Sequence, residues 1–182
     1  MRIDKVHEIE GVRITQIKSS SDDRGTFLKF HPSDVFNGTL DSIAISFNPI
    51  VGTIRGLHFQ TEPYAEEKLV TCLRGAIFDV ILDLREDSNT FGKWASIELS
   101  SDNTFQAFLP KGVAHGFQTL LPDSVIHYGL GAPYVSEYSY SINPLGDLGI
   151  DWPLEITSVS KKDTSGVSFL VAAEKYAKSL ES

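Results

Sequence analysis

Short stretches of apolar residues alternate with Gly, Pro, Asn, Asp and Ser from about residue 11 to residue 152. Stretches of this length and spacing predict short β-strands, and a long series of them is typical of a sandwich or barrel rather than of alternating strands and helices. The predicted strands cover residues 11–18, 26–30, 41–47, 53–60, 68–73, 76–85, 93–99, 104–109, 114–120, 125–130 and 137–142. The pattern therefore indicates a mostly β fold.

The end of the chain follows a different period. Between residues 168 and 180, apolar side chains recur at helical spacing, which predicts one helix that packs against the sheets. These apolar residues are Phe169, Ala172, Ala173, Tyr176 and Leu180. No internal repeat or linker-like segment divides the sequence, so we expect residues 1–182 to form a single domain.

The strand predicted at 76–85 carries acids among apolar residues. Ile77, Asp79, Ile81 and Asp83 fall on one face, while the other face is wholly apolar. This mixture indicates a strand that is buried on both sides and whose first face lines a cavity. Asp79 then needs a partner, because a buried acid without one is costly. A backbone group, a core arginine and a catalytic role are all open explanations.

The strand predicted at 53–60 contains Arg55 and His58, which strict alternation would place on opposite faces. Gly56 lies between them and permits a β-bulge, which would bring both side chains to one face. A single histidine in a strand is more often structural than catalytic. The local pattern alone leaves both roles open.

Composition and charge limit the classes of protein and of partner that fit this sequence. Apolar residues make up 41% and charged residues 22%, as in ordinary globular proteins. The single cysteine, Cys72, suits a reducing compartment, and no apolar run approaches the roughly 20 residues of a membrane span. The first residues lack a signal-peptide pattern, so we expect a cytoplasmic protein. The net charge of −8 argues against nucleic-acid and membrane partners, although a few cationic side chains would suffice for an anionic small ligand.

Histidine placement points to one barrel superfamily. Zinc-finger spacing, a phosphate-binding loop and a nucleophile elbow are all missing from the sequence. A Pro/Gly turn at 110–115 delivers His115 to the start of a strand, which resembles the second motif of the cupin superfamily. Metal-binding cupins carry a His-x-His pair in their first motif, where this chain has only His58. We therefore expect no metal and no cofactor, and we interpret His7, His31 and His127 as incidental.

Several segments in register resemble the dTDP-4-dehydrorhamnose 3,5-epimerase family. They are Arg-Gly-Leu-His-Phe-Gln at 55–60, Lys-Leu-Val at 68–70, Gly-Ala-Ile-Phe-Asp-Val at 75–80, Asp-Leu-Arg at 83–85, Thr-Phe-Gly-Lys-Trp at 90–94, Ala-His-Gly-Phe at 114–117 and Gly-Ile-Asp-Trp-Pro-Leu at 149–154. The resemblance implies a metal-free cupin, that is, a double-stranded β-helix or jelly-roll barrel. It also implies a homodimer with a shared substrate pocket and a nucleoside-diphosphate 4-keto-6-deoxy sugar as substrate.

The implied reaction removes a proton next to the ketone and returns one from the opposite face of the sugar, at C-3, C-5 or both. By the same resemblance, His58 is the base and Asp163 its supporting carboxylate. Lys68 would stabilise the enolate oxygen, and Tyr128 would be the acid on the other face. These residue types suit the chemistry, because imidazole titrates near neutral pH and tyrosine holds its proton there.

The resemblance also implies a set of substrate-binding residues. Arg55 and His115 would hold the sugar or diphosphate, with Asp79 in support, and Tyr134 would frame the sugar. Arg24 would reach a phosphate across a subunit interface. Further residues expected at the substrate are Lys29 and Gln60.

The chain departs from the family pattern in three places. Lys29 stands where the family usually has Glu, Ile43 and Ile45 replace a Gln-x-Asn pair, and the loop 129–133 replaces a lysine after Tyr128. The nucleotide base, the exact sugar and the epimerised carbon therefore remain open. Two other functions stay as alternatives: a metal-dependent cupin and a non-catalytic module that binds a sugar nucleotide.

Overall fold

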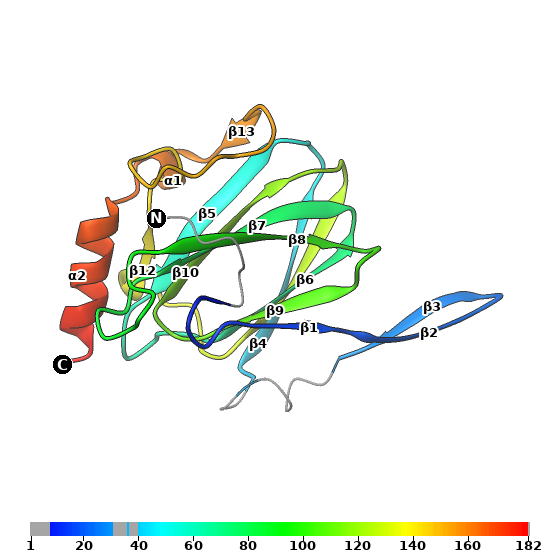
Figure 1. The fold of residues 1–182 in the computed structure, drawn as a ribbon, viewed down its shortest axis with the longest axis horizontal. Coiled ribbons are helices and arrows are strands. Elements are labelled where there is room, and N and C mark those ends of the chain that lie inside the picture. Colours follow the sequence, from blue (N-terminus) through cyan, green and yellow to red (C-terminus); the bar gives the residue numbers. More distant parts are fainter. Residues whose placement is uncertain (1–7, 31–35, 37–39, 182) are drawn as a thin grey trace.

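The computed structural model describes residues 8–30, 36 and 40–181, so His7 and His31 lie outside the described residues. Two mainly antiparallel sheets face each other (Figure 1). The first has the order β1 (Arg13–Gln16), β9 (Phe105–Leu109), β6 (Lys68–Arg74), β11 (Ser124–Leu130) and β4 (Ser42–Asn48). The second has the order β12 (Ser139–Ser141), β5 (Thr53–Gln60), β10 (Val113–Thr119), β7 (Ala76–Asp83) and β8 (Trp94–Ser100).

Apolar side chains from both sheets meet between them. Val70 and Ile126 come from the first sheet, and Ile81 and Phe117 from the second, and all four are at most 1% exposed. Burial of a shared apolar interior is the main favourable term for two facing sheets. The arrangement is the mostly β jelly-roll barrel that the sequence predicts.

Strand β7 is buried on both faces, as its mixed pattern predicts. Ile81 faces the barrel interior, whereas Val80 and Leu82 belong to a second apolar cluster. That cluster includes Ala172 and Tyr176 of helix α2 (Phe169–Ser179), which lies along the outer face of the second sheet (Figure 1). The predicted C-terminal helix is thus confirmed, and it explains why this face of β7 is apolar.

The predicted bulge in β5 is also present. Arg55 pairs with Phe117 and His58 with His115, so three residue steps on β5 match two on β10. Gly56 has a φ of +107°, and a Cβ at this position would lie 2.6 Å from the Cα of Gly116. Only glycine fits this close approach.

The elements that the pattern did not predict are short or polar. Strand β2 (Lys18–Asp22) reads Lys-Ser-Ser-Ser-Asp, without apolar alternation. It forms a hairpin that projects from the barrel with β3 (Gly25–Lys29), the strand that the pattern did predict at 26–30. The predicted strand 11–18 is divided at Ile17, and the first half of 137–142 is a 3₁₀ turn, Ser136–Tyr138. Strand β13 (Ser158–Val159) pairs with β5 and leads into helix α1 (Lys161–Thr164). Within the described part of the chain, no helix has the length and apolarity that crossing a membrane requires.

Candidate active site

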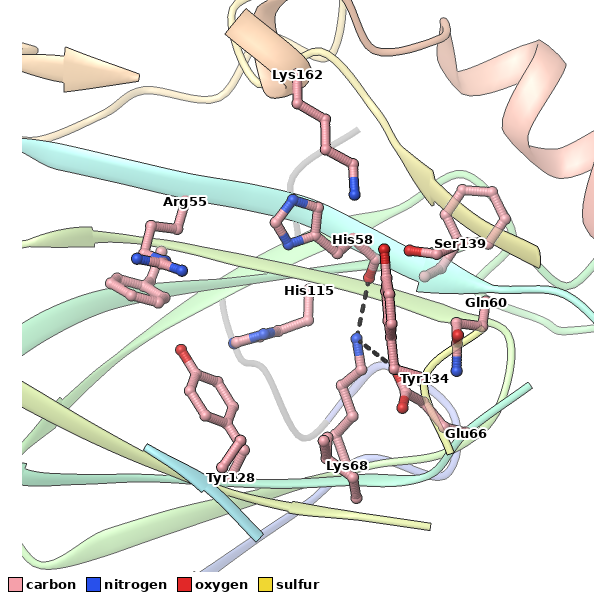
Figure 2. A pocket seen from close by; sticks show the side chains of 14 residues that line it. Arg55, His58, Gln60, Glu66, Lys68, His115, Tyr128, Tyr134, Ser139 and Lys162 are labelled. Carbon is pink, nitrogen blue, oxygen red and sulfur yellow. Dashed lines mark hydrogen bonds and ion pairs between the residues drawn. The ribbon is translucent and has the colours of Figure 1, made fainter. Parts of the chain in front are cut away.

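A cavity of about 350 Å³ lies between the two sheets, and most of the predicted site residues line it (Figure 2). The second sheet contributes β5, β10 and β12, and the first contributes β4, β6 and β11. The lining residues are Ala44, Arg55, His58, Phe59, Gln60, Glu66, Lys68, His115, Phe117, Tyr128, Leu130, Tyr134, Ser139 and Lys162. The bulge therefore places Arg55 and His58 on one face, as predicted.

His58 is hydrogen bonded to Asp163 of helix α1, with 2.6 Å between Nε2 and Oδ1. Asp163 also accepts hydrogen bonds from the Ser141 hydroxyl at 3.1 Å and the Gly56 N–H at 3.4 Å. Burial alone would raise the pKa of Asp163, but the hydrogen bonds and charge of His58, together with Ser160 and Gly56, lower it to about 2. The carboxylate is therefore ionised at neutral pH. It binds Nε2 and leaves Nδ1 turned toward the cavity (Figure 2).

Directly opposite His58 on β10, His115 forms a second pair of this kind. Its Nε2 lies 2.6 Å from Oδ1 of Asp79, and this pair is almost completely buried. Burial raises the pKa of Asp79, although the charge and hydrogen bond of His115 act in the other direction. Asp79 lies behind His115 rather than at the cavity wall. The partner that this acid requires is therefore a histidine, not the backbone or a core arginine.

Lys68 enters the cavity from β6. Its ammonium donates to the carbonyl oxygen of His58 at 3.3 Å and lies 3.1 Å from Oε1 of Glu66. Both side chains of this ion pair are about nine-tenths buried. Sequence reasoning missed Glu66, because within Glu66-Glu67-Lys68 nothing distinguishes a pocket acid from a solvated charge run.

Tyr128 lines the cavity from β11, in the sheet opposite His58 (Figure 2). Its hydroxyl lies 3.4 Å from the hydroxyl of Ser46, and burial raises its pKa to about 12. The phenol is therefore protonated at neutral pH. A base candidate and an acid candidate thus stand on opposite walls of one cavity.

Tyr134 lies at the cavity mouth, with 65% of its surface exposed. The ammonium of Lys162 is 6.0 Å from its ring centre, and Lys162 also lines the cavity. Lys162 was not among the predicted site residues, since a lysine pair at 161–162 is typical of an exposed surface. Gln60 is almost completely buried and bonds to the backbone beside Tyr134.

Two predicted residues lie away from this cavity. Arg24 and Lys29 belong to the projecting hairpin, where the Arg24 side chain is 89% exposed and pairs with Asp22. Neither residue lines the cavity of a single chain, so the role of Arg24 across a subunit interface and the place of Lys29 at the substrate stay predictions. Strand β4 places Ile43 and Ile45 on its surface, 60% and 50% exposed.

Among the described residues, no three His, Cys, Asp or Glu side chains are grouped so as to hold a metal ion. The Nε2 atoms of His58 and His115, the two histidines of the cavity, are each bonded to a carboxylate.

Comparison with known proteins gives a consistent result. The family model described as dTDP-4-dehydrorhamnose 3,5-epimerase matches residues 6–170. The dTDP-4-dehydrorhamnose 3,5-epimerase of Sinorhizobium fredii is 42% identical over 166 residues, which cover 86% of this chain and 84% of that protein.

Two solved structures show the same fold. The 3,5-epimerase of Legionella pneumophila, in complex with dTDP-4-keto-L-rhamnose, has a TM-score of 0.86 and 34% identity, covering 96% of this chain and 95% of that one. ChmJ, a 3′-monoepimerase from Streptomyces bikiniensis in complex with dTDP-quinovose, has a TM-score of 0.83 and 28% identity, covering 91% and 87%. From the family match and these identities, the chain belongs to the dTDP-4-dehydrorhamnose 3,5-epimerase family and is an isomerase.

Proposed function

We propose that the protein inverts C-3, C-5 or both carbons of a nucleoside-diphosphate 4-keto-6-deoxy sugar, with the dTDP-linked sugar as the first candidate. One observation carries the proposal: the His58–Asp163 pair and Tyr128 stand on opposite walls of the same cavity. Epimerisation needs this arrangement, because the proton that leaves one face of the ring must be replaced from the other.

In the first step, Nδ1 of His58 takes the proton from the carbon next to the ketone. The C–H electron pair moves to the ketone oxygen and forms an enolate. The ionised Asp163 orients the ring and stabilises the imidazolium that results. The ammonium of Lys68 provides positive charge for the enolate oxygen.

In the second step, the hydroxyl of Tyr128 gives its proton to the same carbon from the opposite face, and the ketone is restored. The tyrosinate recovers a proton from solvent, and the imidazolium of His58 returns its proton to solvent. A pKa raised to about 12 keeps Tyr128 protonated until an adjacent carbanion demands the proton.

Cationic side chains account for binding of an anionic substrate by an acidic protein. Arg55, Lys68 and Lys162 line the cavity together, whereas the whole chain carries a net charge of −8. Arginine suits a diphosphate, because its planar fork donates two parallel hydrogen bonds. His115, held by Asp79, supplies a rigid hydrogen-bonding group beside the sugar.

A second copy of the chain completes this proposal. The hairpin that carries Arg24 and Lys29 projects from the barrel, and apolar side chains are exposed on β3 and on edge strand β4. These exposed residues are Phe27, Ile43, Ile45 and Phe47. A homodimer would cover them and would bring Arg24 to the partner's cavity. The predicted location of the dimer is the cytoplasm.

Mixing two inactive variants tests the shared pocket. Arg24→Ala and His58→Asn are each expected to be defective alone, but re-associated dimers with one copy of each contain one intact site. A 1:1 mixture should therefore recover about a quarter of wild-type activity. Light scattering checks that the mixed protein is dimeric. If such a mixture recovers no activity, the pocket is not shared between subunits.

Proton exchange tests the reaction itself. Purified protein is mixed with dTDP-4-keto-6-deoxyglucose in deuterated buffer containing a chelator, and the C-3 and C-5 protons are followed separately by NMR. Loss of one or both signals supports the proposal and identifies the carbon. Exchange that disappears with chelator and returns with a metal would favour a metal-dependent cupin. Tight binding without exchange would favour a binding module.

A further inference from the structure

The amide of Gln60 binds three backbone groups, in two segments of the chain, at the edge of the cavity. The side chain is 4% exposed, and its Nε2 donates to the carbonyl oxygens of Tyr64 at 3.0 Å and Pro133 at 3.2 Å. Its Oε1 accepts from the N–H of Val135 at 2.9 Å. Both amide N–H groups are therefore engaged with the protein, and so is the carbonyl oxygen.

Two of these hydrogen bonds flank Tyr134. Pro133 and Val135 are its neighbours in the chain. Gln60 donates to the carbonyl of Pro133 and accepts from the N–H of Val135. The Tyr134 side chain itself is 65% exposed, so packing contributes little to its position. The place of the ring at the cavity mouth therefore depends on its backbone, and the backbone is held by Gln60 (Figure 2).

We propose that Gln60 is a positioning residue, which acts through Tyr134 to set the orientation of the sugar in the cavity. The inference rests on the proposed function and on the expected role of Tyr134, whose ring lines the cavity and would frame the sugar. C-3 and C-5 lie on opposite sides of the ketone carbon, so a shift of this aromatic wall tilts the ring and changes which carbon faces His58. Displacements of about 1 Å in such contacts can cost about 10²-fold in rate. Gln60 thus controls the balance between exchange at the two carbons without touching the substrate.

The chain contains a matched control for this clamp. Gln118 on β10 is fully buried, and its Nε2 donates to the carbonyl of Leu154 at 2.9 Å. Its Oε1 accepts from the Leu154 N–H at 3.0 Å. The two glutamines make the same kind of contact, but Gln118 does not line the cavity. A change at Gln118 should alter stability without altering orientation of the sugar.

The first experiment needs no substrate. Amide hydrogen exchange, read by mass spectrometry on peptides covering residues 131–138, compares wild type with Gln60→Glu and Gln118→Glu. A carboxylate at position 60 keeps an acceptor for Val135 but cannot donate to Pro133, so protection should fall at least about 10-fold in these peptides. Gln118→Glu should leave them unchanged. Unaltered protection in folded Gln60→Glu would overturn the clamp.

The second experiment measures the consequence. Gln60→Met removes all the side-chain hydrogen bonds of Gln60 and keeps a side chain of similar size. This variant replaces Gln60→Glu in the experiment if the charged variant does not fold. Both Gln60 variants should change the C-3 to C-5 exchange ratio by about 10-fold and raise KM, while Gln118→Glu keeps the ratio within about 2-fold. If the amides of residues 131–138 lose protection but the C-3 to C-5 exchange ratio stays the same, Gln60 does not control the orientation of the sugar. Absence of exchange in the wild type would instead overturn the proposed function, and the hydrogen-exchange result would still decide the clamp.

Discussion

The barrel contains two histidine–carboxylate pairs on neighbouring strands, with the same 2.6 Å between Nε2 and Oδ1. His58 and His115 even face each other in register. Their surroundings differ. The His58 side chain is 37% exposed, and Asp163 has several further donors, so its pKa falls to about 2. Asp79 is fully buried, its Oδ2 has no partner among the described residues, and burial raises its pKa.

The comparison teaches that burial, rather than the pair itself, decides what the pair can do. A solvent-accessible imidazole beside a permanently ionised carboxylate can take up and release protons, as a catalytic base must. An imidazole locked inside the barrel by a buried acid is a fixed hydrogen-bonding group. The following predictions test this division, from the largest effect to the smallest.

Removal of the accessible imidazole should have the largest effect. His58→Asn is expected to lower the rate at which the substrate's C-3 and C-5 protons exchange with solvent by at least about 10³-fold, because the variant has no base at the reacting carbon. Its unfolding temperature should fall by no more than about 8 °C, since the ring is partly exposed and the main loss is its hydrogen bond to Asp163. Deuterium exchange under saturating substrate measures the first effect and calorimetry the second. His127→Asn, at a histidine outside the cavity, is the control, and an equal loss there would contradict the assignment.

The two carboxylates should then separate by kinetics. Asp163→Asn is expected to lower kcat by about 10²-fold at unchanged fold, because a neutral amide neither fixes the tautomer of His58 nor stabilises its cation. Asp79→Asn should instead raise KM more than it lowers kcat, since His115 holds the substrate. Steady-state kinetics on both variants decides the point. The same kcat loss in both would remove the distinction between the pairs.

Tyr128 sharpens the comparison from the opposite wall. Tyr128→Phe is expected to lower net inversion by about 10²-fold, yet to keep some exchange, because His58 can still remove and return a proton on its own face. NMR separates the two readouts within a single sample. Full inversion by the Tyr128→Phe protein would refute its role as the acid.

Stability against pH should show the smallest effect, with opposite signs for the two acids. The pKa of Asp163 is lowered in the folded state, so its stabilisation is present above about pH 4 and is lost as pH falls toward 2, amounting to about 2 kcal/mol. The pKa of Asp79 is raised, so its contribution is largest below about pH 4 and declines as pH rises.

Urea unfolding between pH 2.5 and 6 measures these contributions. Asp163→Asn should lose less stability than wild type as the pH falls. Asp79→Asn should gain stability relative to wild type as the pH rises toward 6. Identical pH profiles for wild type and Asp163→Asn would show that folding does not lower the pKa of this carboxylate.

Local pattern was enough for much of the fold. The alternation in β7 and the helical period in α2 follow directly from which side chains must be buried, and Gly56 marked the bulge because only glycine tolerates the close approach to β10. Strand β2 could not be predicted, since all its residues are exposed and its sequence has no alternation of apolar and polar residues.

Sequence by itself determined the barrel class, the family and the residue types for proton transfer. Tertiary structure decided which of them meet. It paired Asp79 with His115 across β7 and β10, added Glu66 and Lys162 to the cavity, and joined the Gln60 amide to the backbone beside Tyr134. The physical reason is that hydrogen-bond partners and burial depend on residues far apart in the chain, and no local pattern records which of them the sheets bring together.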